Sequence, residues 1–96
     1  MKALDPYVID TLMGDLVGHD RSPAAFVVWL FLWRRTAGSG KASAALSLQD
    51  IARATGLSKS AVQAAVKRLK TRRLITAQRA GTTAAPFYTL HMHWKS

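Results

Sequence analysis

One stretch of the sequence decides the fold, and it reads LSKSAVQAAVKRLKTRRLI at residues 57–75. Apolar side chains recur in it at the three- and four-residue spacing of one helical face, which predicts a helix over 59–73. The predicted buried stripe consists of Val62, Ala65, Val66 and Leu69. The predicted outward stripe consists of Ser60, Gln63, Ala64, Lys67 and Thr71, with Arg68 and Lys70 on its flanks. We therefore expect a helix that is buried on one side and cationic on the other.

The residues before this helix supply the start and stop signals of a second one. Ser47 can cap a helix over 48–55, with Asp50 at the third helical position as in a capping box. Gly56 ends that helix, because glycine adopts the positive φ of a tight turn most readily, and Ser58 can cap the helix that follows. Two helices joined by a short turn that contains glycine form a helix-turn-helix unit.

A β-hairpin is predicted directly after the unit. The run ITAQ at 75–78 is strand-like, RAGTTAAP at 79–86 is turn-like, and FYTLHMHW at 87–94 alternates in polarity as a strand does. One face of the last strand would carry Tyr88, Leu90, Met92 and Trp94, which we interpret as core or subunit interface. The opposite face would carry Phe87, Thr89, His91 and His93.

Two further helices are predicted before the unit. Asp5-Pro6 is a typical helix start, and a helix over 6–17 would place Ile9, Leu12, Met13, Leu16 and Val17 on one face. Ser22-Pro23 repeats the signal for a helix over 22–37, followed by a GSGKASAA linker at 38–45 and a short strand within 45–48. The 22–37 helix has no polar face before Arg34, so it has to be covered on all sides. Either the 6–17 helix or a second subunit would cover it.

The outward face of the 59–73 helix suits the major groove of DNA. Ser60 and Gln63 would lie near base edges, and the cations further along would meet phosphates. The order of elements also resembles winged helix-turn-helix DNA-binding domains of bacterial and phage regulators and replication proteins. The resemblance covers about residues 22–94 and is carried by an A-x-x-x-G-L-S-x-S-x-V spacing. That spacing is supplied by Ala52, Gly56, Leu57, Ser58, Ser60 and Val62.

This resemblance implies a mainly α-helical fold with a small β-hairpin wing, an α+β winged helix-turn-helix, here with an extra N-terminal helix. It implies groove-facing positions at Lys59, Ser60, Ala61, Gln63, Ala64 and Lys67, and a wing at 79–86. Arg73 stands where many relatives have a helix-ending glycine, and Ala64 where several have a long polar side chain. The full set of candidate DNA-binding residues is Ser58, Lys59, Ser60, Ala61, Gln63, Ala64, Lys67, Arg68, Lys70, Thr71, Arg79, Thr82 and Thr83. For the three wing residues, a solvated hairpin tip is the alternative.

Composition supports a polyanionic partner. The 96 residues suffice for one domain, 1–96, in which 1–20 would be a helical extension and a possible dimerisation element. Residues 21–96 hold 13 Lys or Arg against Asp50 alone, which favours nucleic acid and, less strongly, an anionic membrane surface. The chain has no Cys and no recognisable signal peptide, and its longest apolar run, 24–33, is about half of the ~20 residues of a membrane span. We expect a cytoplasmic protein, at the nucleoid when bound to DNA.

These features predict a small transcriptional regulator that binds double-stranded DNA as a homodimer through residues 6–37, with no membrane association. The alternatives are a replication or plasmid origin-binding protein, a protein-interaction winged helix, and a monomer in which helix 6–17 caps helix 22–37. We expect no enzymatic activity and no cofactor, because no nucleophile and base are paired by sequence and no phosphate-binding glycine loop is present. We also expect no metal, because His91 and His93 lack Cys or carboxylate neighbours.

Overall fold

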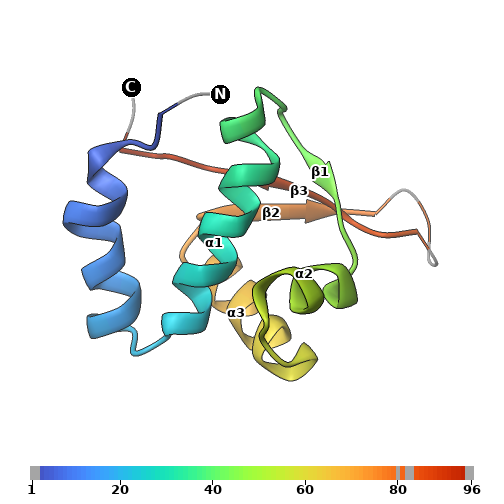
Figure 1. The fold of residues 1–96 in the computed structure, drawn as a ribbon, viewed down its shortest axis with the longest axis horizontal. Coiled ribbons are helices and arrows are strands. Elements are labelled where there is room, and N and C mark those ends of the chain that lie inside the picture. Colours follow the sequence, from blue (N-terminus) through green and yellow to red (C-terminus); the bar gives the residue numbers. More distant parts are fainter. Residues whose placement is uncertain (1–2, 80, 82–83, 95–96) are drawn as a thin grey trace.

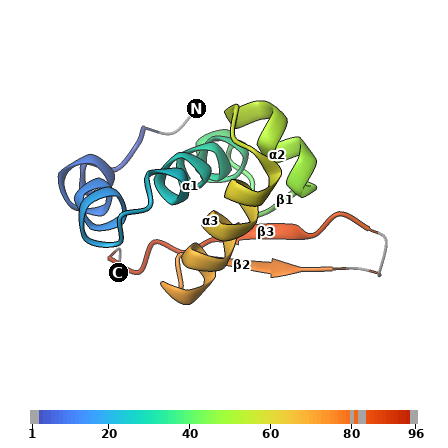
Figure 2. The same ribbon diagram turned by 90° about the horizontal axis from the view of Figure 1, so that it is seen from below.

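Three α-helices and a small sheet follow residue 22 in a computed structural model, which describes residues 3–79, 81 and 84–94 (Figure 1). The helices are α1 (Pro23–Arg35), α2 (Leu48–Thr55) and α3 (Lys59–Thr71). The strands are β1 (Ala44–Ala45), β2 (Ile75–Gln78) and β3 (Phe87–Leu90), and they form an antiparallel sheet in the order β1-β3-β2. This is the predicted α+β winged helix-turn-helix arrangement, with the antiparallel strands β2 and β3 beside the helices (Figures 1 and 2).

The helix-turn-helix unit forms where the sequence predicts it. The Ser47 hydroxyl accepts a hydrogen bond from the Asp50 amide at 3.0 Å, and the Asp50 carboxylate accepts one from the Ser47 amide at 3.0 Å, which completes the capping box. Gly56 ends α2 with φ of 80°. The Ser58 hydroxyl accepts the Ala61 amide at 3.1 Å and so caps α3. Each signal joins residues four apart or fewer, so it can be recognised in the local sequence.

The C-terminal end of α3 has the geometry of a glycine-terminated helix, although the residue there is Arg73. Arg73 has φ of 58°, in the left-handed region. Its amide donates to the Lys70 carbonyl at 3.0 Å, and the Leu74 amide donates to the Leu69 carbonyl at 2.9 Å. These two bonds form a Schellman motif, and the buried side chains of Leu69 and Leu74 lie at the positions that usually make contact in it. The left-handed backbone costs an arginine roughly 1 kcal/mol more than a glycine.

The N-terminal helix winds differently from the prediction. It consists of two π-helical segments, Val8–Leu12 and Gly14–His19, in which the hydrogen bonds span five residues. Side chains four apart lie on one side of this helix, as they also do in an α-helix. Val8, Leu12 and Leu16 form a row that is buried in the core, whereas Ile9, Met13 and Val17 form a separate exposed row. The sequence placed all five predicted residues on one face, and the structure divides them between these two rows: Leu12 and Leu16 are buried, and Ile9, Met13 and Val17 are exposed.

The N-terminal helix packs along one side of α1 (Figure 1). This is one of the two predicted ways of covering that apolar helix, the other being a second subunit. Of the large apolar residues of α1, Phe26, Trp29 and Leu32 are buried within the chain. Helix α1 begins at Pro23, where the Ser22 hydroxyl accepts the Ala25 amide at 3.4 Å, and it ends at Arg35, two residues earlier than predicted. A short 3₁₀ turn, Ala37–Ser39, follows it.

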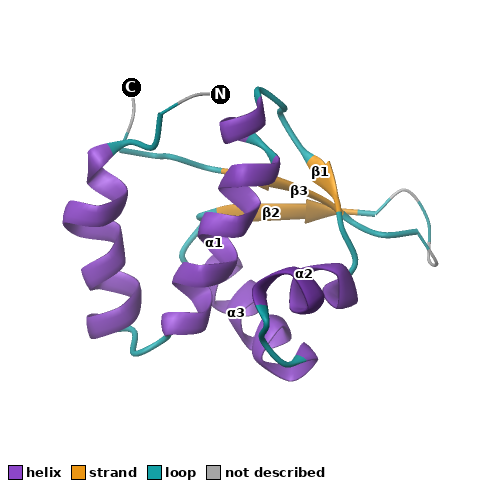
Figure 3. Ribbon diagram, in the orientation of Figure 1, coloured by secondary structure: helices purple, strands orange, loops and turns teal. Residues whose placement is uncertain are grey.

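The sheet has one buried face and one exposed face, as the alternating sequence predicts. Figure 3 shows its three strands in orange beside the helices in purple. Tyr88 pairs with Ala77 of β2 and with Ala44 of β1, and its side chain is 3% exposed, whereas the next-door Phe87 is 45% exposed. Strand β3 ends at Leu90, so the predicted strand to residue 94 is too long. It ends there because Leu90 pairs with Ile75, the first residue of β2.

The chain after β3 returns to the N-terminal helix and closes the core. The Trp94 ring stacks on Tyr7 with centroids 4.4 Å apart and an interplanar angle of 17°. Trp94 also lies 6.0 Å from the ring of Trp29 on α1, at an angle of 44°. We call Tyr7, Trp29 and Trp94 the aromatic clasp. It holds together three segments that are far apart in the sequence.

Candidate nucleic-acid interface

The outward face of α3 presents the side chains that the sequence predicts. Val62, Ala65, Val66 and Leu69 are buried, and they hold the helix against the rest of the domain. Among the candidate residues on or beside α3, Ala61 alone is half-buried. The exposed candidates are Ser58, Lys59, Ser60, Gln63, Ala64, Lys67, Arg68, Lys70 and Thr71. Packing therefore fixes the orientation of the helix and leaves small, amide and cationic groups facing solvent.

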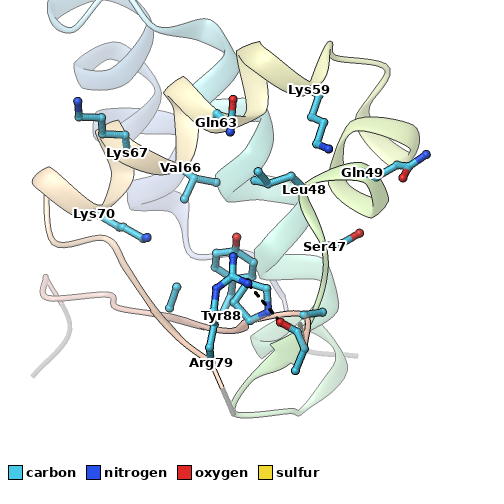
Figure 4. A pocket seen from close by; sticks show the side chains of 14 residues that line it. Ser47, Leu48, Gln49, Lys59, Gln63, Val66, Lys67, Lys70, Arg79 and Tyr88 are labelled. Atoms are coloured by element: carbon cyan, nitrogen blue, oxygen red, sulfur yellow. Dashed lines mark hydrogen bonds between the residues drawn. The ribbon is translucent and has the colours of Figure 1, made fainter. Parts of the chain in front are cut away.

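A groove runs between α3, the start of α2 and the base of the wing, with a volume of about 780 Å³ (Figure 4). Four of its lining residues are cations, and all four are candidate DNA-binding residues: Lys59, Lys67, Lys70 and Arg79. None of the described residues that line it is acidic. We call this feature the basic groove. Its charge makes it a place for an anion.

The basic groove unites some of the predicted residues and not others. Gln63 and the four cations line it, whereas Ser60, Ala64, Arg68 and Thr71 lie on other parts of the α3 surface. At the wing, an Arg79 guanidinium nitrogen lies 3.5 Å from the Ala84 carbonyl oxygen, to which it donates across the hairpin. Thr82 and Thr83 fall outside the described residues.

Several groove residues were missed by the sequence-based prediction. They come from the start of α2, from the buried side of α3, from the predicted wing and from the sheet: Ser47, Leu48, Gln49, Val66, Ala77, Ala84, Ala85, Pro86 and Tyr88. Most of them contribute apolar surface to the lining of the groove. Tyr88 was predicted as core or subunit interface, and its ring is buried, yet its hydroxyl end faces the groove (Figure 4). The available signal was its position, at the start of the strand that follows the wing.

A comparison of the chain with models of protein families identifies a known family. The model that describes the MarR family matches residues 35–84, just over half of the 96-residue chain. The chain belongs to the MarR family. The matched span contains α2, α3, β2 and part of the wing, and the family is one of winged-helix DNA-binding transcription regulators rather than of enzymes. No curated protein and no solved structure matches the chain.

Outside the matched MarR-family span, the N-terminal helix anchors the end of α3. The Arg72 Nε donates to the Asp20 carboxylate at 2.8 Å, and His19 Nδ1 lies 2.9 Å from the other Asp20 oxygen. The Asp20 side chain is only 6% exposed. The hydrogen bond with His19, together with the bond to Arg72 and its charge, lowers the pKa of Asp20 in spite of burial. No local sequence pattern records this contact, because Asp20 and Arg72 are 52 residues apart in the sequence.

Other chemistry is not assembled in this MarR-family chain within the described ranges. No group of three or more His, Cys, Asp or Glu side chains that could hold a metal ion occurs among residues 3–79, 81 and 84–94. His91 Nε2 lies 3.1 Å from the Thr76 hydroxyl, which links the end of β3 to β2. No helix in the described part of the chain is long and apolar enough to cross a membrane.

Proposed function

We propose that this MarR-family protein binds double-stranded DNA at specific sequences and regulates transcription, with α3 in the major groove. The observation that carries the proposal is the exposed small, amide and cationic face of α3 beside a basic groove. A major groove about 12 Å wide admits one α-helix. Ser60 and Gln63 would then lie near base edges, and Lys67, Lys70 and Arg79 near phosphates. The protein would act as a single domain in the cytoplasm, at the nucleoid when bound.

All of the candidate DNA-binding positions take part in this proposal. The cap and first turn of α3 would approach the bases and the nearest phosphates, with Ser58, Lys59, Ser60 and Ala61 in that part. Ala64 would face base edges through its methyl group, and Arg68 and Thr71 would follow the adjacent backbone. Thr82 and Thr83 would belong to the wing contact together with Arg79. Neutralising about five phosphates would make log K fall with log[salt] at a slope of roughly −4 to −5.

Gln63 and Lys67 are expected to contribute in different ways. The Gln63 amide can pair in a bidentate manner with adenine, a contact worth roughly 1–3 kcal/mol of discrimination. Gln63→Ala should therefore relax preference at one base position and leave nonspecific binding nearly unchanged. Lys67→Ala should weaken binding to all sequences alike and reduce the salt slope by about one. Binding-site selection on each variant, with fluorescence anisotropy at two salt concentrations, measures both effects.

The two variants are matched, because both replace exposed side chains on one stripe of α3, four residues apart. Thermal melts should show both variants folded, since surface substitutions usually change stability by no more than about 0.5 kcal/mol. An unchanged sequence preference in Gln63→Ala would move base readout to another residue. If the wild-type protein binds no DNA fragment at low salt, the DNA proposal is wrong, and an acidic protein partner becomes the better explanation of the basic groove.

We also propose a homodimer formed through the N-terminal helix. The supporting observation is the exposed row Ile9, Met13 and Val17, with exposed fractions of 47%, 38% and 38%. A second copy would bury this row and bring two α3 helices to half-sites about 34 Å apart, one turn of DNA. The Leu12 and Leu16 side chains, which the sequence placed on the same apolar face, are already buried within the chain.

Met13→Glu should convert the dimer to a monomer at concentrations of tens of micromolar, because it places a charge in the centre of the exposed row. Light scattering measures the mass directly. Phe87→Glu is the control, since it introduces the same charge at an exposed apolar position on the sheet, and it should stay dimeric. A wild-type protein that is monomeric at tens of micromolar would refute the dimer.

A further inference from the structure

The Tyr88 ring is buried in the core, and its hydroxyl faces the basic groove. Its side chain is 3% exposed, and it lines the basic groove from strand β3. In Figure 4 the ring stands below α3, with its hydroxyl directed toward the segment of α3 that carries Val66. The buried side-chain polar atoms that lack a hydrogen-bond partner among the described residues are the indole nitrogens of Trp29 and Trp94, and the Tyr88 hydroxyl is not one of them. Because the hydroxyl faces the groove, it can exchange a water partner for a group on a bound ligand.

The surroundings of the hydroxyl select a negatively charged acceptor. Burial raises the pKa of Tyr88, and the nearby Arg79 charge only partly offsets this effect, so the phenol stays protonated and remains a donor at neutral pH. Lys70 extends from α3 into the same part of the groove (Figure 4). Ala77 and Pro86 line the groove with apolar surface. A hydrogen bond is stronger in such surroundings than in water.

The placement of the residue favours the DNA backbone over the bases. Under the proposed function, the outer stripe of α3 enters the major groove, whereas Tyr88 lies on strand β3, below α3 (Figure 4). Base edges are recessed within the duplex, but phosphate groups protrude from it. A strand that passes between α3 and the wing would bring a phosphate to the groove floor.

We propose that Tyr88 donates a hydrogen bond from its hydroxyl to a non-bridging phosphate oxygen of the DNA strand that crosses the basic groove. This inference rests on the proposed function and assigns a DNA-positioning role to a residue that otherwise belongs to the core. Lys70 and Arg79 supply the accompanying positive charge. The contact fixes the position of the DNA backbone between α3 and the wing, and it carries no sequence information.

The test is Tyr88→Phe, which keeps the ring in the core and removes only the hydroxyl. Binding is expected to weaken about tenfold, the value for one hydrogen bond to a charged acceptor, on specific and nonspecific duplexes alike. The salt slope should not change, because a neutral hydroxyl displaces no counterion. Lys70→Ala should instead lower the slope by about one. Fluorescence anisotropy over a salt series, with full-length protein, distinguishes these two kinds of contact.

Tyr7→Phe is the matched control, since Tyr7 stacks on Trp94 and is not among the residues that line the groove. It should leave affinity unchanged, and thermal melts should show both variants folded. Equal affinity of Tyr88→Phe and wild type would overturn the inference and leave DNA binding intact. A loss confined to the specific duplex would also overturn it, in favour of a base contact. Failure of the wild-type protein to bind any duplex would instead refute the proposed function.

Discussion

Trp29→Ala is expected to lower the free energy of unfolding by about 3–5 kcal/mol. The side chain is completely buried on α1 and lies against Trp94 in the aromatic clasp. Its removal leaves a cavity between α1, the N-terminal helix and the C-terminal segment. Because a small domain is stable by only about 5–15 kcal/mol, this variant should be close to unfolded at 37 °C or lack a cooperative transition.

Trp29→Phe should cost far less, about 1 kcal/mol. The reason is that the indole N–H of Trp29 is buried and has no acceptor among the residues that the structure describes. Phenylalanine removes this unsatisfied donor while it keeps most of the aromatic surface. The free energy gained by removing the unpaired N–H thus offsets part of the free energy lost with the smaller side chain.

Urea denaturation followed by tryptophan fluorescence and far-UV circular dichroism measures both Trp29 variants. Phe87→Ala is the control, because Phe87 is a half-exposed aromatic residue on the outer face of the sheet. It should change stability much less than Trp29→Ala. If Trp29→Phe proved as destabilising as Trp29→Ala, the indole N–H would have a partner, and the account of the clasp would be wrong.

Asp20→Asn is expected to destabilise the protein by about 2 kcal/mol at pH 7, the value of a hydrogen bond between charged groups in a largely buried site. Hydrogen bonding with His19 and with Arg72 holds the pKa of Asp20 below its usual range. In the unfolded chain an aspartate has a pKa of about 3.9. The folded protein therefore favours the ionised form.

The sign of the pH effect follows from this difference. A carboxyl group whose pKa is lower in the folded state contributes stability above the unfolded pKa, and the contribution is lost as the pH falls through the folded pKa. The stability gap between wild type and Asp20→Asn should thus be constant above about pH 5 and narrow progressively below about pH 4.

Chemical denaturation of both proteins between pH 2.5 and 7 would follow this gap. Asp10→Asn is the matched control, because Asp10 lies on the same N-terminal helix and is exposed. Its effect should stay within about 0.5 kcal/mol. A gap between wild type and Asp20→Asn that does not narrow in acid would mean that the carboxylate of Asp20 is not what ties the N-terminal helix to α3.

The helix-turn-helix unit could be predicted from the sequence because its signals are local. The Ser47–Asp50 capping box, the left-handed Gly56 and the Ser58 cap each act within one turn of helix. The apolar stripe of α3 likewise repeats along a single element. The outward candidates on α3 were correctly placed for the same reason, because a side that is not buried faces solvent.

The basic groove could be predicted only in part. Its α3 cations are visible as a charged face, but Tyr88 reads as an ordinary inward residue of a strand. Its hydroxyl reaches the groove because the register of β3 places it opposite Ala77 and beneath α3. The register of this hairpin depends on pairing between residues nine to 15 positions apart, which no local pattern records.

The sequence by itself determined the helix-turn-helix, the hairpin that follows it, the cationic face of α3 and the presence of an N-terminal helix. Tertiary structure decided which side of that helix is buried, since Val8, Leu12 and Leu16 are buried only because the rest of the core packs on them. It also decided the Asp20–Arg72 ion pair and the aromatic clasp, in which Tyr7 and Trp94 come from opposite ends of the chain. Local signals follow from hydrogen bonds within a turn, whereas these contacts require the whole core to bring distant segments together.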